Sequence, residues 1–148
     1  MISCIIIDDE PKARNLLQAI VTEYCPELSI AALCDDLPNG IKAIKKHKPQ
    51  LILLDIEMPG HSGLELLDFF NEDEIDFDII FTTAYNEYAI QAFRFSAIDY
   101  LLKPIQHTQL IEAVQRVVKK QNSKPTEQLK TLKQNLDSSV NWEEKRIV

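Results

Sequence analysis

The sequence has 148 residues, 45% hydrophobic and 26% charged, so its composition is that of an ordinary globular protein with one domain or a small domain and a tail. The formal net charge of −7 disfavours general nucleic-acid binding, because an acidic chain repels phosphate backbones. The three cysteines form no CxxC pair, and the apolar run near the N-terminus is too short for a signal peptide or a membrane span, so we expect a soluble cytoplasmic protein without membrane contact.

Apolar runs and helical patterns alternate five times along the chain. The runs that predict strands are residues 2–7, 28–34, 51–54, 77–82 and 98–102. Helical spacing of apolar residues predicts helices that begin at Pro11, Pro38, Ser62 and Asn86, and a fifth helix over residues 110–118. Glu65 stands three residues after Ser62, which is the spacing of a capping box. Continuous apolar strands indicate a sheet buried on both faces, with helices on either side.

These elements predict an α/β fold, a doubly wound five-stranded parallel sheet of order 2-1-3-4-5, which is the flavodoxin-like arrangement. The domain is expected to span residues 1–121. Residues 122–148 are expected to be a linker or tail, with a breaker at Pro125 and a short helix marked by Leu129, Leu132 and Leu136. In this topology the ligand crevice lies at the carboxyl ends of the strands.

Charged and hydroxyl side chains follow those strand ends. The first strand ends in Asp8-Asp9-Glu10, the third in Asp55, the fourth in Thr82-Thr83-Ala84 and the fifth in Lys103-Pro104. Carboxylates this close repel one another, and a hard divalent cation relieves the conflict, so Mg²⁺ is expected. A metal, a lysine and a hydroxyl around one free carboxylate form an arrangement that can handle a phosphoryl group, with aspartate as the nucleophile.

Four stretches together resemble the receiver domain of bacterial two-component response regulators. They are Asp8-Asp9-Glu10, the segment LILLDIEMPG ending in Gly60, Thr83-Ala84, and Tyr100 followed by Lys103-Pro104. The segments FTTAYNEYAIQAF and AIDYLLKPI further resemble receivers of LytTR-type (LytR/AlgR-like) regulators, whose output domain binds DNA. No such output domain is found in these 148 residues, so DNA contact would belong to an absent C-terminal region.

The resemblance implies a role for each matching residue. Asp55 would accept a phosphoryl group from a histidine kinase. Asp8, Asp9, Asp55 and the backbone carbonyl of Glu57 would hold Mg²⁺. Thr83, Lys103 and the backbone of Ala84 would bind the phosphoryl oxygens. Thr83 and Tyr100 would form the switch, and the bond between Lys103 and Pro104 would be cis.

Phosphorylation adds charge and acceptor oxygens, so it would draw Thr83 inward and let Tyr100 rotate. The surface expected to respond comprises the fourth predicted helix, the fifth strand and the fifth helix, and includes Tyr88, Ala92, Phe95 and Ala97. The same surface is a candidate for homodimerisation.

Two other functions compete with this interpretation. A phosphatase of the haloacid-dehalogenase type also uses a nucleophilic aspartate after an apolar strand, but it places a second aspartate two residues on, where this chain has Glu57. A pseudo-receiver would be an interaction module that is never phosphorylated. We expect the chain not to be an enzyme acting on a free substrate, but at most to assist its own phosphorylation and dephosphorylation.

Overall fold

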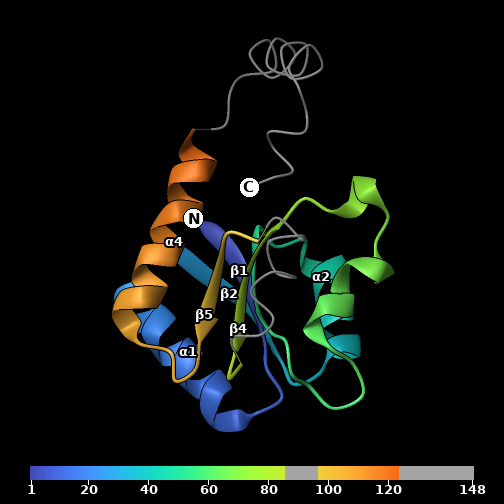
Figure 1. Cartoon of the computed structure of the whole chain (residues 1–148). Helices are drawn as coiled ribbons and strands as arrows, with labels where there is room; N and C mark the ends of the chain where they lie inside the picture. The colour runs from blue at the N-terminus through green and yellow to red at the C-terminus, as the bar shows by residue number, and fades with distance from the viewer. Residues whose placement is uncertain (86–96, 124–148) are drawn as a thin grey trace, which may run out of the picture. The chain divides into compact units, whose positions relative to one another are not determined.

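The computed structural model describes residues 1–85 and 97–123. The chain divides into two compact units, residues 1–118 and 119–148. In the first unit, five parallel strands form one sheet in the order β2-β1-β3-β4-β5 (Figure 1). The predicted fold class and strand order are therefore confirmed. The helix predicted from Asn86 and the tail helix around Leu132 lie outside the described residues.

The strands are β1 (Ile2–Ile7), β2 (Leu28–Cys34), β3 (Leu51–Asp55), β4 (Asp78–Thr83) and β5 (Asp99–Leu102). Their register aligns the carboxyl ends: Ile7 pairs with Leu54 and Asp55 with Thr82. The residues that follow β1, β3 and β5 therefore meet at one edge of the sheet.

The helices are α1 (Pro11–Tyr24), α2 (Leu37–His47) and α4 (His107–Asn122). Proline opens α1, where its missing N–H has no helical partner to lose. The side chain of Asp36 caps α2 by accepting the Asn39 N–H at 2.8 Å. No helix in residues 1–85 or 97–123 is long and apolar enough to cross a membrane.

The predicted third helix differs from expectation. Ser62 and Glu65 do form the predicted capping box, but the segment that they open is a 3-10 helix, η1 (Gly63–Phe69), followed by the single turn η2 (Glu72–Glu74). A second capping box at Asn71 starts η2 directly after η1. Two short capped turns therefore occupy the place of one α-helix.

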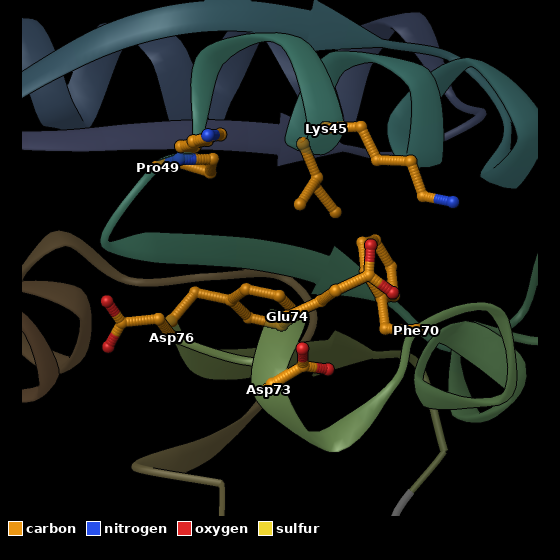
Figure 2. A pocket seen from close by; sticks show the side chains of 9 residues that line it. Lys45, Pro49, Phe70, Asp73, Glu74 and Asp76 are labelled. Carbon is orange, nitrogen blue, oxygen red and sulfur yellow. The ribbon is translucent and has the colours of Figure 1, made fainter.

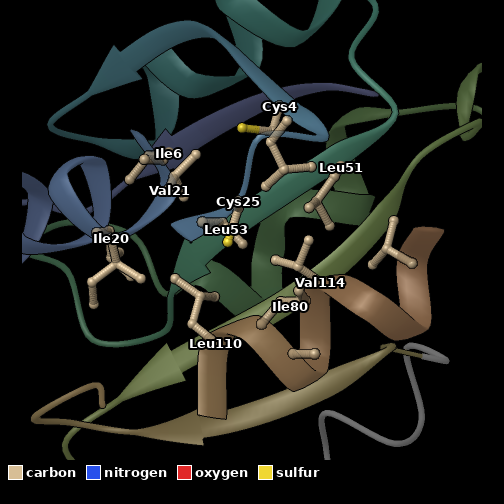
Figure 3. Close-up of a cluster of buried hydrophobic side chains, with 14 of the residues drawn as sticks. Cys4, Ile6, Ile20, Val21, Cys25, Leu51, Leu53, Ile80, Leu110 and Val114 are labelled. Carbon is tan, nitrogen blue, oxygen red and sulfur yellow. The ribbon is translucent and has the colours of Figure 1, made fainter. Parts of the chain in front are cut away.

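Apolar clusters cover both faces of the sheet. One joins the strands to α1 and α4 and includes Cys4, Leu53 and Val114 (Figure 3). The other joins the strands to α2 and η1 and includes Cys34. All three cysteines, Cys4, Cys25 and Cys34, are buried and unpaired. Burial raises the pKa of the Cys4 thiol to about 12 and that of Cys25 to about 11.

Candidate functional site

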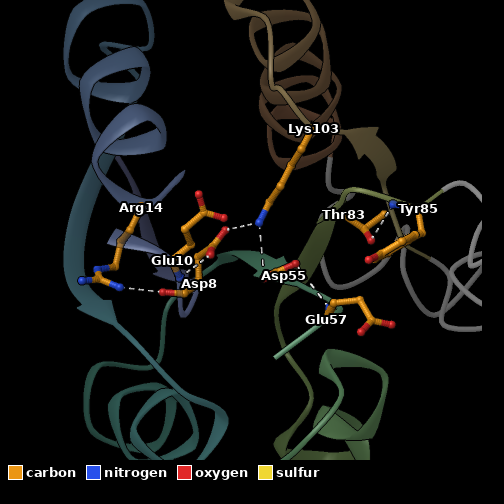
Figure 4. Close-up of polar contacts among 8 residues, drawn as sticks. All are labelled: Asp8, Glu10, Arg14, Asp55, Glu57, Thr83, Tyr85 and Lys103. Carbon is orange, nitrogen blue, oxygen red and sulfur yellow. Dashed lines mark hydrogen bonds and ion pairs between the residues drawn. The ribbon is translucent and has the colours of Figure 1, made fainter. Parts of the chain in front are cut away.

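The acidic turn after β1 consists of Asp8, Asp9 and Glu10. Hydrogen bonds between the Asp8 backbone and residues elsewhere in the chain hold it in place. The Asp8 N–H donates to the carbonyl of Cys34 at 3.0 Å, and the Asp8 carbonyl accepts from Arg14 Nη1 at 2.7 Å (Figure 4). Asp8 Oδ1 accepts the Glu10 N–H at 2.9 Å. The Asp8 side chain is fully buried, so its carboxylate has a fixed direction.

Asp55 ends β3 and is 2% exposed. Its Oδ1 atom accepts the N–H of Glu57 at 3.3 Å. Lys103 reaches the same place from the end of β5, with its Nζ 2.9 Å from Asp8 Oδ2 and 3.3 Å from Asp55 Oδ2 (Figure 4). The Lys103 N–H donates to the carbonyl of Thr83 at 2.7 Å, and the bond between Lys103 and Pro104 is cis, as the resemblance implied. One ammonium therefore lies between two buried carboxylates.

Three carboxylates converge at this edge. Oxygen atoms of Asp8, Asp9 and Asp55 all lie within 4.8 Å of one another. Burial, then the charge of Asp8, raise the pKa of Asp55 to about 7, although Lys103 opposes that rise. The pKa of Lys103 is itself raised: its burial acts in the opposite direction, but its bond to Asp8 and the charge of Asp55 prevail.

The three carboxylates fit a hard divalent cation. Among the described residues, Lys103 is the cation in ion-pair contact with Asp8 and Asp55, so the three negative charges are only partly compensated. Carboxylate oxygens are the ligands that Mg²⁺ prefers, and Asp9 is half-buried rather than buried. Asp8, Asp9 and Asp55 are therefore the residues that could hold it.

The residues of the predicted switch are linked through Tyr85. Thr83 is fully buried, and its hydroxyl accepts the Tyr85 N–H at 3.2 Å. The phenol of Tyr100 donates a hydrogen bond to the carbonyl of Tyr85. Both backbone polar groups of Tyr85 therefore depend on these two side chains. Ala84 lies exposed between Thr83 and Tyr85, and it lines the same cavity as Lys103.

Two residues with a structural part in this site were not recognised from the sequence. Arg14 lies on α1 and holds the Asp8 carbonyl. At Gly63 a Cβ atom would lie 2.3 Å from the carbonyl oxygen of Asp55, so only glycine allows η1 to approach the end of β3 this closely. Neither a lone arginine nor a lone glycine in the sequence carries a signal for such a contact.

A separate cavity of about 420 Å³ lies near the residues that precede β3 and β4 (Figure 2). Lys45 and Lys48 line one wall, and Asp73, Glu74 and Asp76 line another. All five charged side chains are exposed, so this cavity lacks the buried, converging carboxylates of the opposite sheet edge. The acidic edge remains the candidate site.

Comparisons with known proteins agree with the fold. Residues 4–115 match the family described as the response regulator receiver domain. The chain is 40% identical over 119 residues to an uncharacterized response regulatory protein of Shewanella oneidensis, covering 80% of this chain and 50% of that protein. It is 40% identical over 117 residues to the transcriptional regulatory protein BtsR of Escherichia coli K12, covering 79% and 48%.

Solved structures give the same result. The REC domain of AraT, a response regulator from Geobacillus stearothermophilus, superposes with a TM-score of 0.73 at 28% identity, covering 82% of this chain and 95% of that one. The response regulatory domain of protein mrkE from Klebsiella pneumoniae gives a TM-score of 0.73 at 29% identity, covering 82% and 99%.

The chain belongs to the response regulator receiver domain family. It is thus a signalling domain of two-component systems, a class that works with histidine kinases, and not a classical enzyme. This membership argues against a phosphatase of the haloacid-dehalogenase type. The chain spans about half the length of the curated relatives that it matches.

Proposed function

We propose that this chain is a switch that accepts a phosphoryl group on Asp55 from a histidine kinase. In this proposal Mg²⁺ is held by Asp8, Asp9, Asp55 and the backbone carbonyl of Glu57. The observation that carries the proposal is the convergence of three carboxylates within 4.8 Å, with the Lys103 ammonium 3.3 Å from Asp55 Oδ2. A site that served only to stabilise the fold would gain little from three crowded carboxylates.

The chemistry follows from the charges. A carboxylate oxygen of Asp55 attacks the phosphorus of a phosphohistidine, the P–N bond breaks, and the imidazole nitrogen leaves with the bonding electron pair. Lys103 shifts from its bond with Asp55 to a phosphoryl oxygen, while the Thr83 hydroxyl and the Ala84 N–H donate to the others. Mg²⁺, when bound, supplies charge neutralisation at the transferring oxygens.

A cavity of about 340 Å³ gives the donor a place to approach. It lies beside Lys103 and is lined by α1 and by the residues that follow β4 and β5, among them Leu16, Ala84 and Pro104. Leu16 is 42% exposed, which is high for a leucine next to a polar site. A largely apolar surface beside the acceptor suits contact with a protein that carries the phosphohistidine.

The switch that we propose runs through Tyr85. When the Thr83 hydroxyl bonds a phosphoryl oxygen, its hydrogen bond from the Tyr85 N–H weakens, and the position of the Tyr85 carbonyl that Tyr100 binds changes with it. The response would spread over β5, α4 and the segment 86–96, and the same surface would serve homodimerisation. Of the residues predicted there, Tyr88, Ala92 and Phe95 lie outside the described residues, and Ala97 is half-buried. Shifting the populations of such a two-state element from 1:99 to 99:1 requires about 5.5 kcal/mol.

We further propose that residues 1–121 form the receiver and that residues 122–148 lead toward a LytTR-type DNA-binding output domain that controls transcription in the cytoplasm. The name of the relative BtsR, a transcriptional regulatory protein, supports a role in transcription. DNA contact is assigned to that output domain because the present chain is acidic, with a net charge of −7.

Incubation with acetyl phosphate and Mg²⁺, followed by intact mass measurement, tests the phosphorylation. The expected result is a gain of one phosphoryl group that is absent after addition of EDTA and absent in Asp55→Asn. The control Asp68→Asn changes an exposed aspartate on η1 and should be phosphorylated like the parent. No gain in the parent would favour a pseudo-receiver instead.

A further inference from the structure

Arg14 lies at the start of α1 and reaches back toward the acidic edge. Its backbone N–H donates to the carbonyl of Glu10 at 3.0 Å, which closes the first turn of the helix. Its side chain is half-buried, and Nη1 donates to the carbonyl of Asp8 at 2.7 Å (Figure 4). A hydrogen bond from a guanidinium to a carbonyl is charge-assisted and stronger than one between neutral groups.

This bond completes the attachment of the acidic turn. The N–H of Asp8 is bound by the carbonyl of Cys34, its carbonyl by Arg14, and its Oδ1 by the N–H of Glu10. With these three contacts in place, Asp8 Oδ2 faces Lys103, and the Asp9 carboxylate lies within reach of Asp55. Loss of the Arg14 contact would leave the carbonyl at the start of the turn without its side-chain donor.

The charge of Arg14 opposes Mg²⁺ binding, whereas its hydrogen bond to Asp8 favours it. Among the described residues, no carboxylate lies within ion-pair distance of its guanidinium. Its field extends toward the end of β2, where it lowers the pKa of Cys34 against the larger effects of burial and of Asp35 and Asp36. A cation so near the acidic edge repels Mg²⁺, whereas a fixed turn favours its binding.

We propose that Arg14 is a positioning residue that increases the affinity of the acidic turn for Mg²⁺ by fixing the backbone of Asp8. The inference rests on the proposed function, because it concerns the same metal. Residues that orient metal ligands from outside the ligand set commonly change affinity by about tenfold to a hundredfold. The gain from orientation exceeds the repulsion from the guanidinium charge, which solvent screens at this half-buried position.

The test is a Mg²⁺ titration of the full chain, followed by the amide NMR signals of Glu10 and Ile56, which gives a dissociation constant without any phosphorylation. The variants are Arg14→Met, Arg14→Lys and the control Lys12→Met. Lys12 lies on the same turn of α1, carries the same charge and is exposed, and it makes no hydrogen bond or ion pair among the described residues.

If Arg14 positions the turn, Arg14→Met weakens Mg²⁺ binding about tenfold or more, and Lys12→Met leaves it unchanged or slightly stronger because only repulsion is lost. Arg14→Lys keeps a cationic donor and should bind Mg²⁺ more tightly than Arg14→Met. Hydrogen exchange at the Glu10 amide should become faster in Arg14→Met, as the turn loosens.

Unchanged or tighter Mg²⁺ binding in Arg14→Met would overturn the inference, because charge would then outweigh position. Arg14→Leu, which lacks both the charge and the donor, serves as the second variant should Arg14→Met fail to fold, and Mg²⁺ binding by Arg14→Lys no tighter than by Arg14→Leu would also overturn the inference. Failure of the unaltered chain to bind Mg²⁺ would instead reject the proposed function, and the inference with it.

Discussion

Replacing Asp55, the proposed phosphoacceptor, should make the metal-free protein more stable. Asp55 is 2% exposed and shares its surroundings with the buried carboxylate of Asp8. At pH 8 both burial and the charge of Asp8 disfavour its ionised form, and Lys103 compensates only in part. Asn has nearly the same shape and no charge, so Asp55→Asn removes the repulsion and keeps the packing.

The magnitude follows from the pKa of Asp55, which is raised from 3.8 to about 7. Between these two values the folded state binds more protons at this residue than the unfolded state does, so stability falls as the pH rises through this window. The whole difference corresponds to about 4 kcal/mol. Because Asn loses the ion pair with Lys103, part of this gain is cancelled. We expect Asp55→Asn to raise the free energy of unfolding by about 2–4 kcal/mol at pH 8 and by almost nothing near pH 4.

Urea unfolding followed by far-UV circular dichroism in EDTA, at pH 8 and at pH 4, measures this difference. Asp68→Asn, at an exposed position, should change the free energy of unfolding by less than about 0.5 kcal/mol at either pH. A destabilised Asp55→Asn at pH 8, or a gain that is the same at both pH values, would refute the claim that crowded charge strains this edge.

Three other outcomes are expected. Lys103→Met should destabilise the metal-free protein by about 3 kcal/mol at pH 8 in the same urea assay, because two buried carboxylates lose their cation; a neutral effect would contradict this. Gly63→Ala should lower the free energy of unfolding by about 2–3 kcal/mol, because its Cβ would clash with the Asp55 carbonyl. Gly60→Ala should lower it by only about 1 kcal/mol, because Gly60 has a φ of 85° but open space around it. Equal losses would show that the close approach at Gly63 is not the cause. The three buried cysteines should react with a thiol reagent at pH 8 only after unfolding, since burial raises the pKa of each; rapid labelling of the folded protein would contradict their place in the core.

Much of the architecture could be predicted because the signals were local and redundant. Residues 51–54 form an unbroken apolar run, which is typical of a strand covered on both faces. Once five strands alternated with helices, the handedness of the connections left few strand orders. Because Asp9, Asp55 and Lys103 stand at the carboxyl ends of parallel strands, that strand order predicts that they lie at one edge of the sheet.

Other features depend on contacts that no local pattern encodes. The capping box at Ser62 predicts where η1 begins, but whether the segment continues as an α-helix or gives way to a second capped turn at Asn71 is decided by the folded chain. The reach of Arg14 to the Asp8 carbonyl depends on how α1 leaves the sheet. The need for glycine at residue 63 arises from its distance to the Asp55 backbone, which is fixed only by the folded chain.

The central claim is that this acidic edge makes Asp55 a phosphoryl acceptor, and chemical mapping of the modified residue tests it most directly. After incubation with acetyl phosphate and Mg²⁺, borohydride reduction converts a phosphoaspartate to homoserine, which peptide mass spectrometry locates. We expect homoserine at position 55 in the sample with Mg²⁺ and none in the sample with EDTA. Homoserine at Asp8 or Asp9 instead, or no homoserine in either sample, would contradict the account.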